Sequence, residues 1–150
     1  MKWRREEVAE VFKIAVRVSY SMPRVGPYQP LCIWPELFRT IRELLQMERL
    51  PRRWQPSKFE IACWDASLEW VALIDKDDDR TLIWARAARL PWKLICGRLF
   101  KRMSRQYLFP RWMAALDIIV SALNQHKTSL SLRYAPLLEG LKQEKEDGAL

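Results

Sequence analysis

The stretch that decides the fold runs from Arg80 to Arg111 and reads RTLIWARAARLPWKLICGRLFKRMSRQYLFPR. Its first residues suit a helix, which Leu90-Pro91 must end, because proline cannot continue the hydrogen-bond ladder. A short helix from Trp92 to Leu99 is expected next, followed by a turn from Phe100 to Met103. Ser104 is a natural N-cap for a longer helix. A helix, a short helix, a turn and a longer helix together form the outline of a helix-turn-helix.

The same stretch also holds the positive charge of the protein. The whole chain of 150 residues has a net charge of +8. Because the stretch contains no Asp or Glu, it alone contributes more than this total, and the rest of the chain is close to neutral. A confined positive charge is typical of a protein that binds a polyanion. The nine basic residues are Arg80, Arg86, Arg89, Lys93, Arg98, Lys101, Arg102, Arg105 and Arg111.

The start of the longer helix is where DNA contacts are expected. A helix N-terminus favours phosphate through its dipole, and Arg and Gln side chains can read guanine and adenine edges in the major groove. Pro110 falls six residues after Ser104, so either this helix bends there or the main helix begins near Pro110. The candidate DNA-binding residues are Arg89, Lys93, Lys101, Arg102, Ser104, Arg105, Gln106 and Arg111.

Upstream of this stretch the sequence predicts further helices. An apolar stripe at helical spacing marks a first helix, and a proline-rich loop covers residues 23–35. A second helix is expected from Pro35 to about Glu48. Ser57 and Glu60 form a capping-box pattern that opens a third helix. The stripe of the first helix consists of Val8, Val11, Phe12, Ala15 and Val18, and that of the third consists of Ile61, Trp64, Leu68, Val71 and Ala72.

The acidic run from Asp75 to Asp79 resembles a calcium loop only superficially, because it lacks the glycine and the later glutamate. It is expected to supply the N-cap and first-turn acids of the next helix. After Asn124, a short helix from Pro136 is expected. The sequence thus predicts an all-α protein of five to six helices. Its regions are an N-terminal helical part with the proline-rich loop (1–56), a helix-turn-helix region (57–124) and a C-terminal tail (125–150).

Several classes of protein are not indicated. Cys32, Cys63 and Cys96 form no CxxC, and His126 is the sole histidine, so neither a disulfide framework nor a metal cluster is predicted. The sequence suggests no catalytic residues and no cofactor, and an enzyme is not expected. The longest uncharged run, residues 25–35, contains three prolines and is too short to span a membrane. Without a secretory signal pattern, a cytoplasmic protein is expected.

Several motifs resemble those of a family of small, largely uncharacterised bacterial and phage proteins. The resemblance is most specific in three segments, Trp70–Asp75 (WVALID), Ile83–Ala87 (IWARA) and Pro91–Cys96 (PWKLIC). It extends over about residues 5–124 and implies a C-terminal helix-turn-helix similar to sigma-factor region 4. The chain departs from the family pattern by two extra residues in the turn, by Tyr107 in place of threonine and by Pro110 in place of arginine. Weaker matches are Tyr28, Trp34–Glu36, Ser104-Arg105, Arg111-Trp112 and Ala115-Leu116.

The leading expectation for function is DNA binding, as a transcriptional regulator of a bacterium or prophage. One alternative is a small-terminase-like subunit of phage DNA packaging. Another is a protein-interaction or RNA-polymerase-binding factor whose helix-turn-helix no longer reads bases. Double-stranded DNA is the expected partner, with RNA polymerase or another protein as the alternative. A homodimer would suit a symmetric operator, but no leucine heptad marks a dimer interface.

Overall fold

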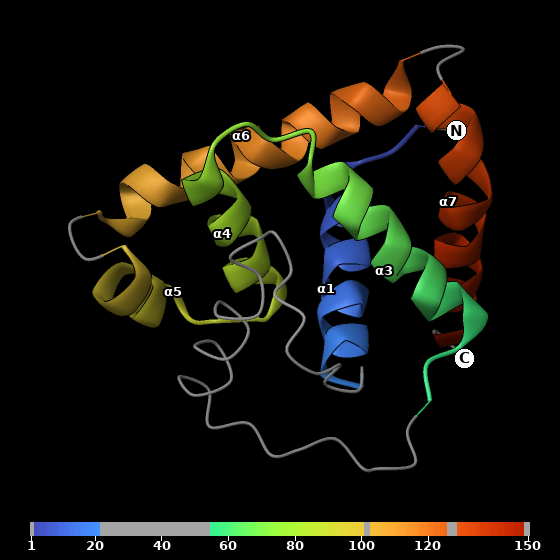
Figure 1. The fold of residues 1–150 in the computed structure, drawn as a ribbon, viewed down its shortest axis with the longest axis horizontal. Helices are drawn as coiled ribbons and strands as arrows, with labels where there is room; N and C mark the ends of the chain where they lie inside the picture. Colours follow the sequence, from blue (N-terminus) through green and yellow to red (C-terminus); the bar gives the residue numbers. More distant parts are fainter. Residues whose placement is uncertain (1, 22–54, 101–102, 126–128, 149–150) are drawn as a thin grey trace, which may run out of the picture.

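The computed structural model of the chain describes residues 2–21, 55–100, 103–125 and 129–148. These residues form helices and contain no β-strand, which confirms the expected all-α fold (Figure 1). The predicted loop at 23–35 and the predicted helix from Pro35 to Glu48 lie outside the described residues. The helices are α1 (Arg5–Ser21), α3 (Lys58–Val71), α4 (Asp77–Ala87), α5 (Trp92–Leu94), α6 (Arg105–Asn124) and α7 (Ser129–Gly148), with a π-helical turn at Ile95–Leu99 after α5.

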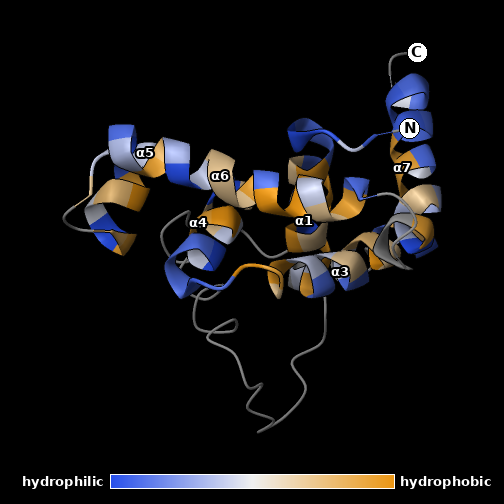
Figure 2. Ribbon diagram, turned by 90° about the horizontal axis from the view of Figure 1, so that it is seen from above, coloured by the Kyte–Doolittle hydropathy of each residue, from blue (hydrophilic) through white to orange (hydrophobic). Residues whose placement is uncertain are grey.

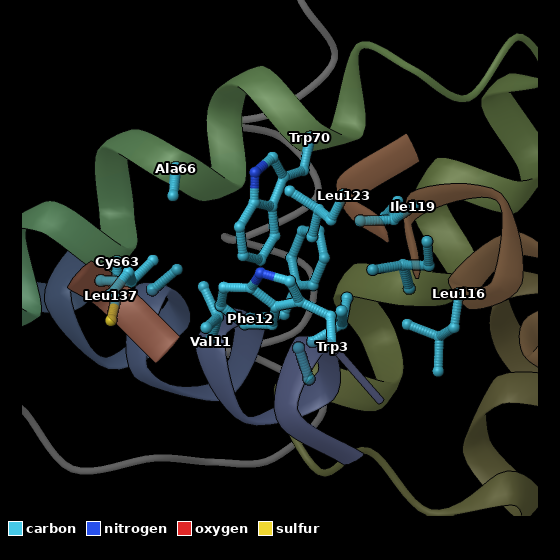
Figure 3. Close-up of a cluster of buried hydrophobic side chains, with 14 of the residues drawn as sticks. Trp3, Val11, Phe12, Cys63, Ala66, Trp70, Leu116, Ile119, Leu123 and Leu137 are labelled. Carbon is cyan, nitrogen blue, oxygen red and sulfur yellow. The ribbon is translucent and has the colours of Figure 1, made fainter. Parts of the chain in front are cut away.

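The main core lies where α1, α3, α4, α6 and α7 meet. The predicted apolar stripe of α1 is confirmed, because all five of its residues are buried. Trp70 is fully buried near Trp3 and Phe12 (Figure 3). Its ring lies edge-on to the rings of Trp3, Phe12 and Tyr134, at centroid distances of 5.1, 6.2 and 5.3 Å. Figure 2 shows hydrophobic segments on α1, α3 and α6 near this junction. The core thus joins residues from all three predicted regions of the chain.

The start of α3 follows the sequence prediction, but its buried face does so only in part. Ser57 and Glu60 form the expected capping box. The predicted inward face is only partly right, because Trp64 and Val71 pack against the core but Ile61 and Leu68 are 40% and 42% exposed. Since apolar residues occur on several sides of α3, periodicity alone could not select the face that its neighbours cover. The residues of α3 that are buried are Cys63, Ala66, Ser67 and Trp70.

Cys63 packs in the main core as a small apolar side chain. Its thiol is buried beside α1 and α7, and this burial raises the pKa of Cys63 to about 12. A thiol with such a pKa stays protonated at neutral pH, and a protonated thiol is a poor nucleophile. Cys63 therefore serves the core as a small buried residue.

The C-terminal helix is longer than the sequence predicts. Instead of beginning at Pro136, α7 runs from Ser129 to Gly148 with Pro136 inside it. Its apolar side packs into the main core through Tyr134, Leu137, Leu138 and Leu141. A Cβ atom at Gly140 would lie 2.7 Å from Cε2 of Phe59, so this glycine lets α7 approach α3 closely.

Two polar contacts also hold α7 against α3. The hydroxyl of Tyr134 donates a hydrogen bond to the carboxylate of Glu69, and Nη1 of Arg133 lies 2.9 Å from the same carboxylate. Burial and the Glu69 contact raise the pKa of Tyr134 to about 12, so its hydroxyl remains a donor at neutral pH.

Among the described residues, no helix is both long and apolar enough to cross a membrane.

Candidate nucleic-acid interface

The first element of the predicted helix-turn-helix is α4. Its N-cap is Lys76, so the expectation of an aspartate cap is wrong, although Asp77, Asp78 and Asp79 do fill the first turn. Acidic side chains there complement the positive end of the helix dipole. Arg80 is tied to this end, because its Nε donates to the carbonyl of Ile74 at 2.6 Å.

The end of α4 is a Schellman motif with an arginine in the left-handed position. Arg89 has a φ of 62°. The amide of Arg89 donates to the carbonyl of Arg86 at 3.0 Å, and that of Leu90 donates to the carbonyl of Ala85 at 3.1 Å. Leu90 and Ala85 are both buried in one cluster, as such a motif requires. This turn, followed by Pro91, ends α4 and directs the chain into α5.

The short helix begins at Trp92, as the sequence predicts, but its second half is π-helical. Pro91 is the N-cap, and after Leu94 the ladder widens until the amide of Phe100 donates to the carbonyl of Ile95 at 2.9 Å. The wider turn brings Ile95 and Phe100 onto the same side, where both are buried. The side chain of Phe100 therefore belongs to the interior, while its carbonyl accepts a hydrogen bond from the amide of Met103 at 3.1 Å, as the predicted turn requires.

A second hydrophobic core joins α4, α5 with the π-helical turn, and the start of α6. It contains buried residues from α4, from the turn after α4, from the π-helical turn and from the start of α6. The residues are Leu82, Ala85, Leu90, Ile95, Phe100 and Leu108, with Trp92, Leu94, Cys96, Leu99, Met103 and Trp112 packed against them. A core shared by these segments is what a helix-turn-helix unit needs, and Leu99 and Trp112 connect it to the main core. We call α4, α5, the π-helical turn and the first two turns of α6 the three-element unit.

The third element, α6, is continuous through Pro110. Ser104 is the N-cap, as predicted, but its side chain makes no capping hydrogen bond, and the first turn contains no acidic residue. The alternative that the main helix begins near Pro110 is wrong, because α6 starts at Arg105. A proline inside a helix costs about 3 kcal/mol. Burial of Leu108 before it and of Ala115 and Leu116 after it offsets this cost.

Most of the described candidate DNA-binding residues lie on the surface. Two of the eight, Lys101 and Arg102, are outside the described residues. Figure 1 shows α5 and the start of α6 at one end of the molecule, with α7 at the other. The exposed candidates are Arg89 in the turn after α4, Lys93 on α5, and Ser104, Arg105 and Gln106 at the start of α6.

The eighth candidate, Arg111, has an intramolecular partner. Its Nη2 lies 2.8 Å from Oδ1 of Asp79, and the two side chains are only 22% and 16% exposed. The guanidinium also lies over the ring of Tyr107, 5.5 Å from its centroid. Burial by itself would lower the pKa of Arg111, but the charges and hydrogen bonds of Asp79 and Tyr107 together outweigh burial and raise it. Arg111 therefore fastens α6 to the start of α4 whatever else it contacts.

The sequence places Arg86 in the basic stretch but does not single it out among the eight candidate DNA-binding residues. Its guanidinium carbon lies 4.7 Å from the centroid of the Trp92 ring and 5.5 Å from that of Trp112. The sequence signal is an arginine flanked by apolar residues, with Leu82 to Ala85 before it and Ala87 after it. The pKa of Arg86 is lowered, first by burial and then by the nearby Arg105.

The conformation of Arg89 carries a testable cost. A left-handed backbone costs a non-glycine residue roughly 1–2 kcal/mol, and glycine avoids this cost. Part of the gain is offset because an unfolded chain with glycine has more conformational freedom to lose on folding. Arg89→Gly is therefore expected to stabilise the fold by about 0.5–1 kcal/mol, and Arg89→Ala is expected to bring no such gain. Chemical denaturation of both variants measures the difference. Equal stability of the two variants would contradict a strained backbone at this position.

Comparison with known proteins gives a family and no function. A search of curated proteins and a search of solved structures found no match. The family model described as "Domain of unknown function (DUF6362)" matches residues 20–119. The match covers about two thirds of the chain, including α3, the whole three-element unit and α6 as far as Ile119. The chain therefore belongs to the DUF6362 family.

Proposed function

We propose that the protein binds double-stranded DNA through the three-element unit. The observation that carries this proposal is a set of exposed basic side chains between Arg89 and Arg105, a segment of the unit that contains no acidic residue. Arg89, Lys93, Arg98 and Arg105 are exposed on it, and none of them forms an ion pair within the described part of the chain. By contrast, Arg80 and Arg111 already have acidic partners. Unpaired cations on the surface of one helical unit are what phosphate binding requires.

The start of α6 is the element proposed to enter the major groove. It presents Arg105 and Gln106 to solvent, and both side chains can form paired hydrogen bonds with base edges. The uncapped N-terminal amides of α6 would favour a backbone phosphate beside the groove. Arg89 and Lys93 would contact phosphates on either side. Such binding fits the expected role in transcriptional regulation of a bacterium or prophage.

A salt titration of DNA affinity tests the proposal. If about five phosphates are contacted, the plot of log affinity against log salt should have a slope of roughly −4.5. Lys93→Ala is expected to make the slope shallower by about 0.9, whereas Arg105→Ala should also reduce discrimination between DNA sequences. Lys145→Ala, on the exposed end of α7, removes the same charge and should change neither quantity. Affinity that is weak and independent of salt would refute DNA binding.

A second candidate function, protein binding, is favoured by apolar side chains on the outside of α6. Tyr107, Phe109 and Ile118 are 53%, 38% and 48% exposed. Exposed hydrophobic residues of this kind occur at protein interfaces. In this alternative, Ile118→Glu would abolish capture of a partner protein and leave salt-dependent DNA affinity unchanged. If Ile118→Glu has no effect on partner capture, the alternative is wrong.

A further inference from the structure

Arg86 is a half-buried cation whose hydrogen bonds are incomplete. Its Nη1 donates to the carbonyl of Leu90 at 2.9 Å. Its Nε is buried and has no hydrogen-bond partner. Instead of a carboxylate, the guanidinium faces the rings of Trp92 and Trp112. Because a buried, unpaired charge is costly, this arrangement calls for a further interaction.

Arg105 brings a second guanidinium to the same tryptophan. Its guanidinium carbon lies 5.9 Å from the centroid of the Trp92 ring, which Arg86 approaches from α4. No carboxylate of the described residues forms an ion pair with either arginine. Burial lowers the pKa of Arg86, and the charge of Arg105 lowers it further. Two like charges held close together are unfavourable until an anion joins them.

A phosphate group fits this pair better than a carboxylate does. Each guanidinium presents a planar fork of donors, and a phosphodiester has oxygens for both. Trp92 holds the two side chains in place, so that less rotamer freedom is lost on binding. Lys13 of α1 lines a small cavity together with Arg86 and Trp112, which places a third cation on the same side of α4. The uncapped start of α6 adds a favourable dipole.

We propose that Arg86 and Arg105, held against Trp92, together bind a single phosphodiester group of duplex DNA. This inference rests on the proposed function and adds to it a phosphate site that spans α4 and α6. In this arrangement the fork of Arg105 contacts the phosphate, which leaves Gln106 as the residue of α6 that faces the base edges, and the cost of the half-buried cation is recovered when DNA binds.

A double-mutant cycle on duplex affinity tests the shared site. Arg86→Gln and Arg105→Gln are each expected to weaken binding about tenfold and to make the salt slope shallower by about 0.9. The double variant should lose little more than either single variant, because one phosphate is lost in every case. Arg86→Lys, which keeps the charge and loses the planar fork, should recover most of the slope and only part of the affinity. Lys145→Gln is the control for charge alone.

The outcomes separate this inference from the proposed function. If the wild type binds DNA and the two losses add fully, or if Arg86→Gln behaves like Lys145→Gln, the shared site is overturned and DNA binding stands. Thermal melts show whether each variant is folded. If Arg86→Gln does not fold, Arg86→Lys replaces it in the comparison.

Tryptophan fluorescence during titration with inorganic phosphate distinguishes the source of the phosphate. No change up to millimolar phosphate is expected for a site that is completed only by DNA. If the wild type binds no DNA, the proposed function and the inference both fail. Saturable quenching by inorganic phosphate that Arg86→Gln removes would then reassign the pair to a free phosphate compound.

Discussion

Trp70→Ala is expected to cost about 3–5 kcal/mol of folding free energy, more than the loss of any ion pair on the surface. The side chain is fully buried and contacts Trp3, Phe12 and Tyr134, so truncation leaves a cavity between α1, α3 and α7. A domain has only about 5–15 kcal/mol of stability in total. The variant should therefore melt on the order of 10 °C below the wild type, as measured by circular dichroism.

Two variants on α3 sharpen this prediction. Leu68→Ala removes an apolar side chain two residues away that is 42% exposed, and it should cost well under about 1 kcal/mol. Trp70→Phe keeps an aromatic ring and removes the buried Nε1, which has no hydrogen-bond partner. It should cost less than Trp70→Ala. If Leu68→Ala destabilises the protein as much as Trp70→Ala does, the orientation of α3 with Trp70 inward is wrong.

Arg111→Ala is expected to have the next largest effect, a loss of about 1–3 kcal/mol. The substitution leaves the carboxylate of Asp79, which is only 16% exposed, without its cation. It also removes the contact with Tyr107. Urea denaturation gives the free energy of unfolding, and the loss should persist at high salt because the pair is largely shielded from solvent.

A double-mutant cycle isolates the Asp79–Arg111 pair. Asp79→Ala together with Arg111→Ala should cost less than the sum of the single variants, because neither charge is left alone. The exposed pair of Arg5 and Asp117, with both side chains 46% exposed, provides the comparison. Breaking it with Asp117→Ala should have little measurable effect. Full additivity at Asp79 and Arg111 would contradict a coupled pair that fastens α6 to α4.

The Asp79–Arg111 pair also bears on how the DNA-binding variants are interpreted. If Arg111→Ala weakens DNA binding, the melting temperature must be compared at the same time, because a displaced α6 would move Arg105 and Gln106 as well. Asp79→Ala frees Arg111 without removing it. A DNA affinity that falls in Arg111→Ala and rises in Asp79→Ala would indicate direct contact by Arg111.

Local sequence features determined a large part of this protein. Ser57 with Glu60 starts α3, Pro91 separates α4 from α5, and Ser104 marks the start of α6, because caps and breakers act through backbone geometry near their own positions. The apolar stripe of α1 was equally predictable, because one side of that helix carries nearly all of its large apolar residues. The position of the positive charge along the chain also came from the sequence alone.

Tertiary structure decided which of several similar residues is buried and which partner each of them contacts. On α3, Leu68 and Trp70 are both apolar, and only the neighbours Trp3, Phe12 and Tyr134 make Trp70 the buried one. On α6, Pro110 lies within a continuous helix because packing on both sides outweighs the lost hydrogen bond. Arg111 and Arg86 look alike in the sequence, yet one meets Asp79 and the other meets Trp92. Such pairings depend on which distant residues folding brings together, and no local pattern contains that information.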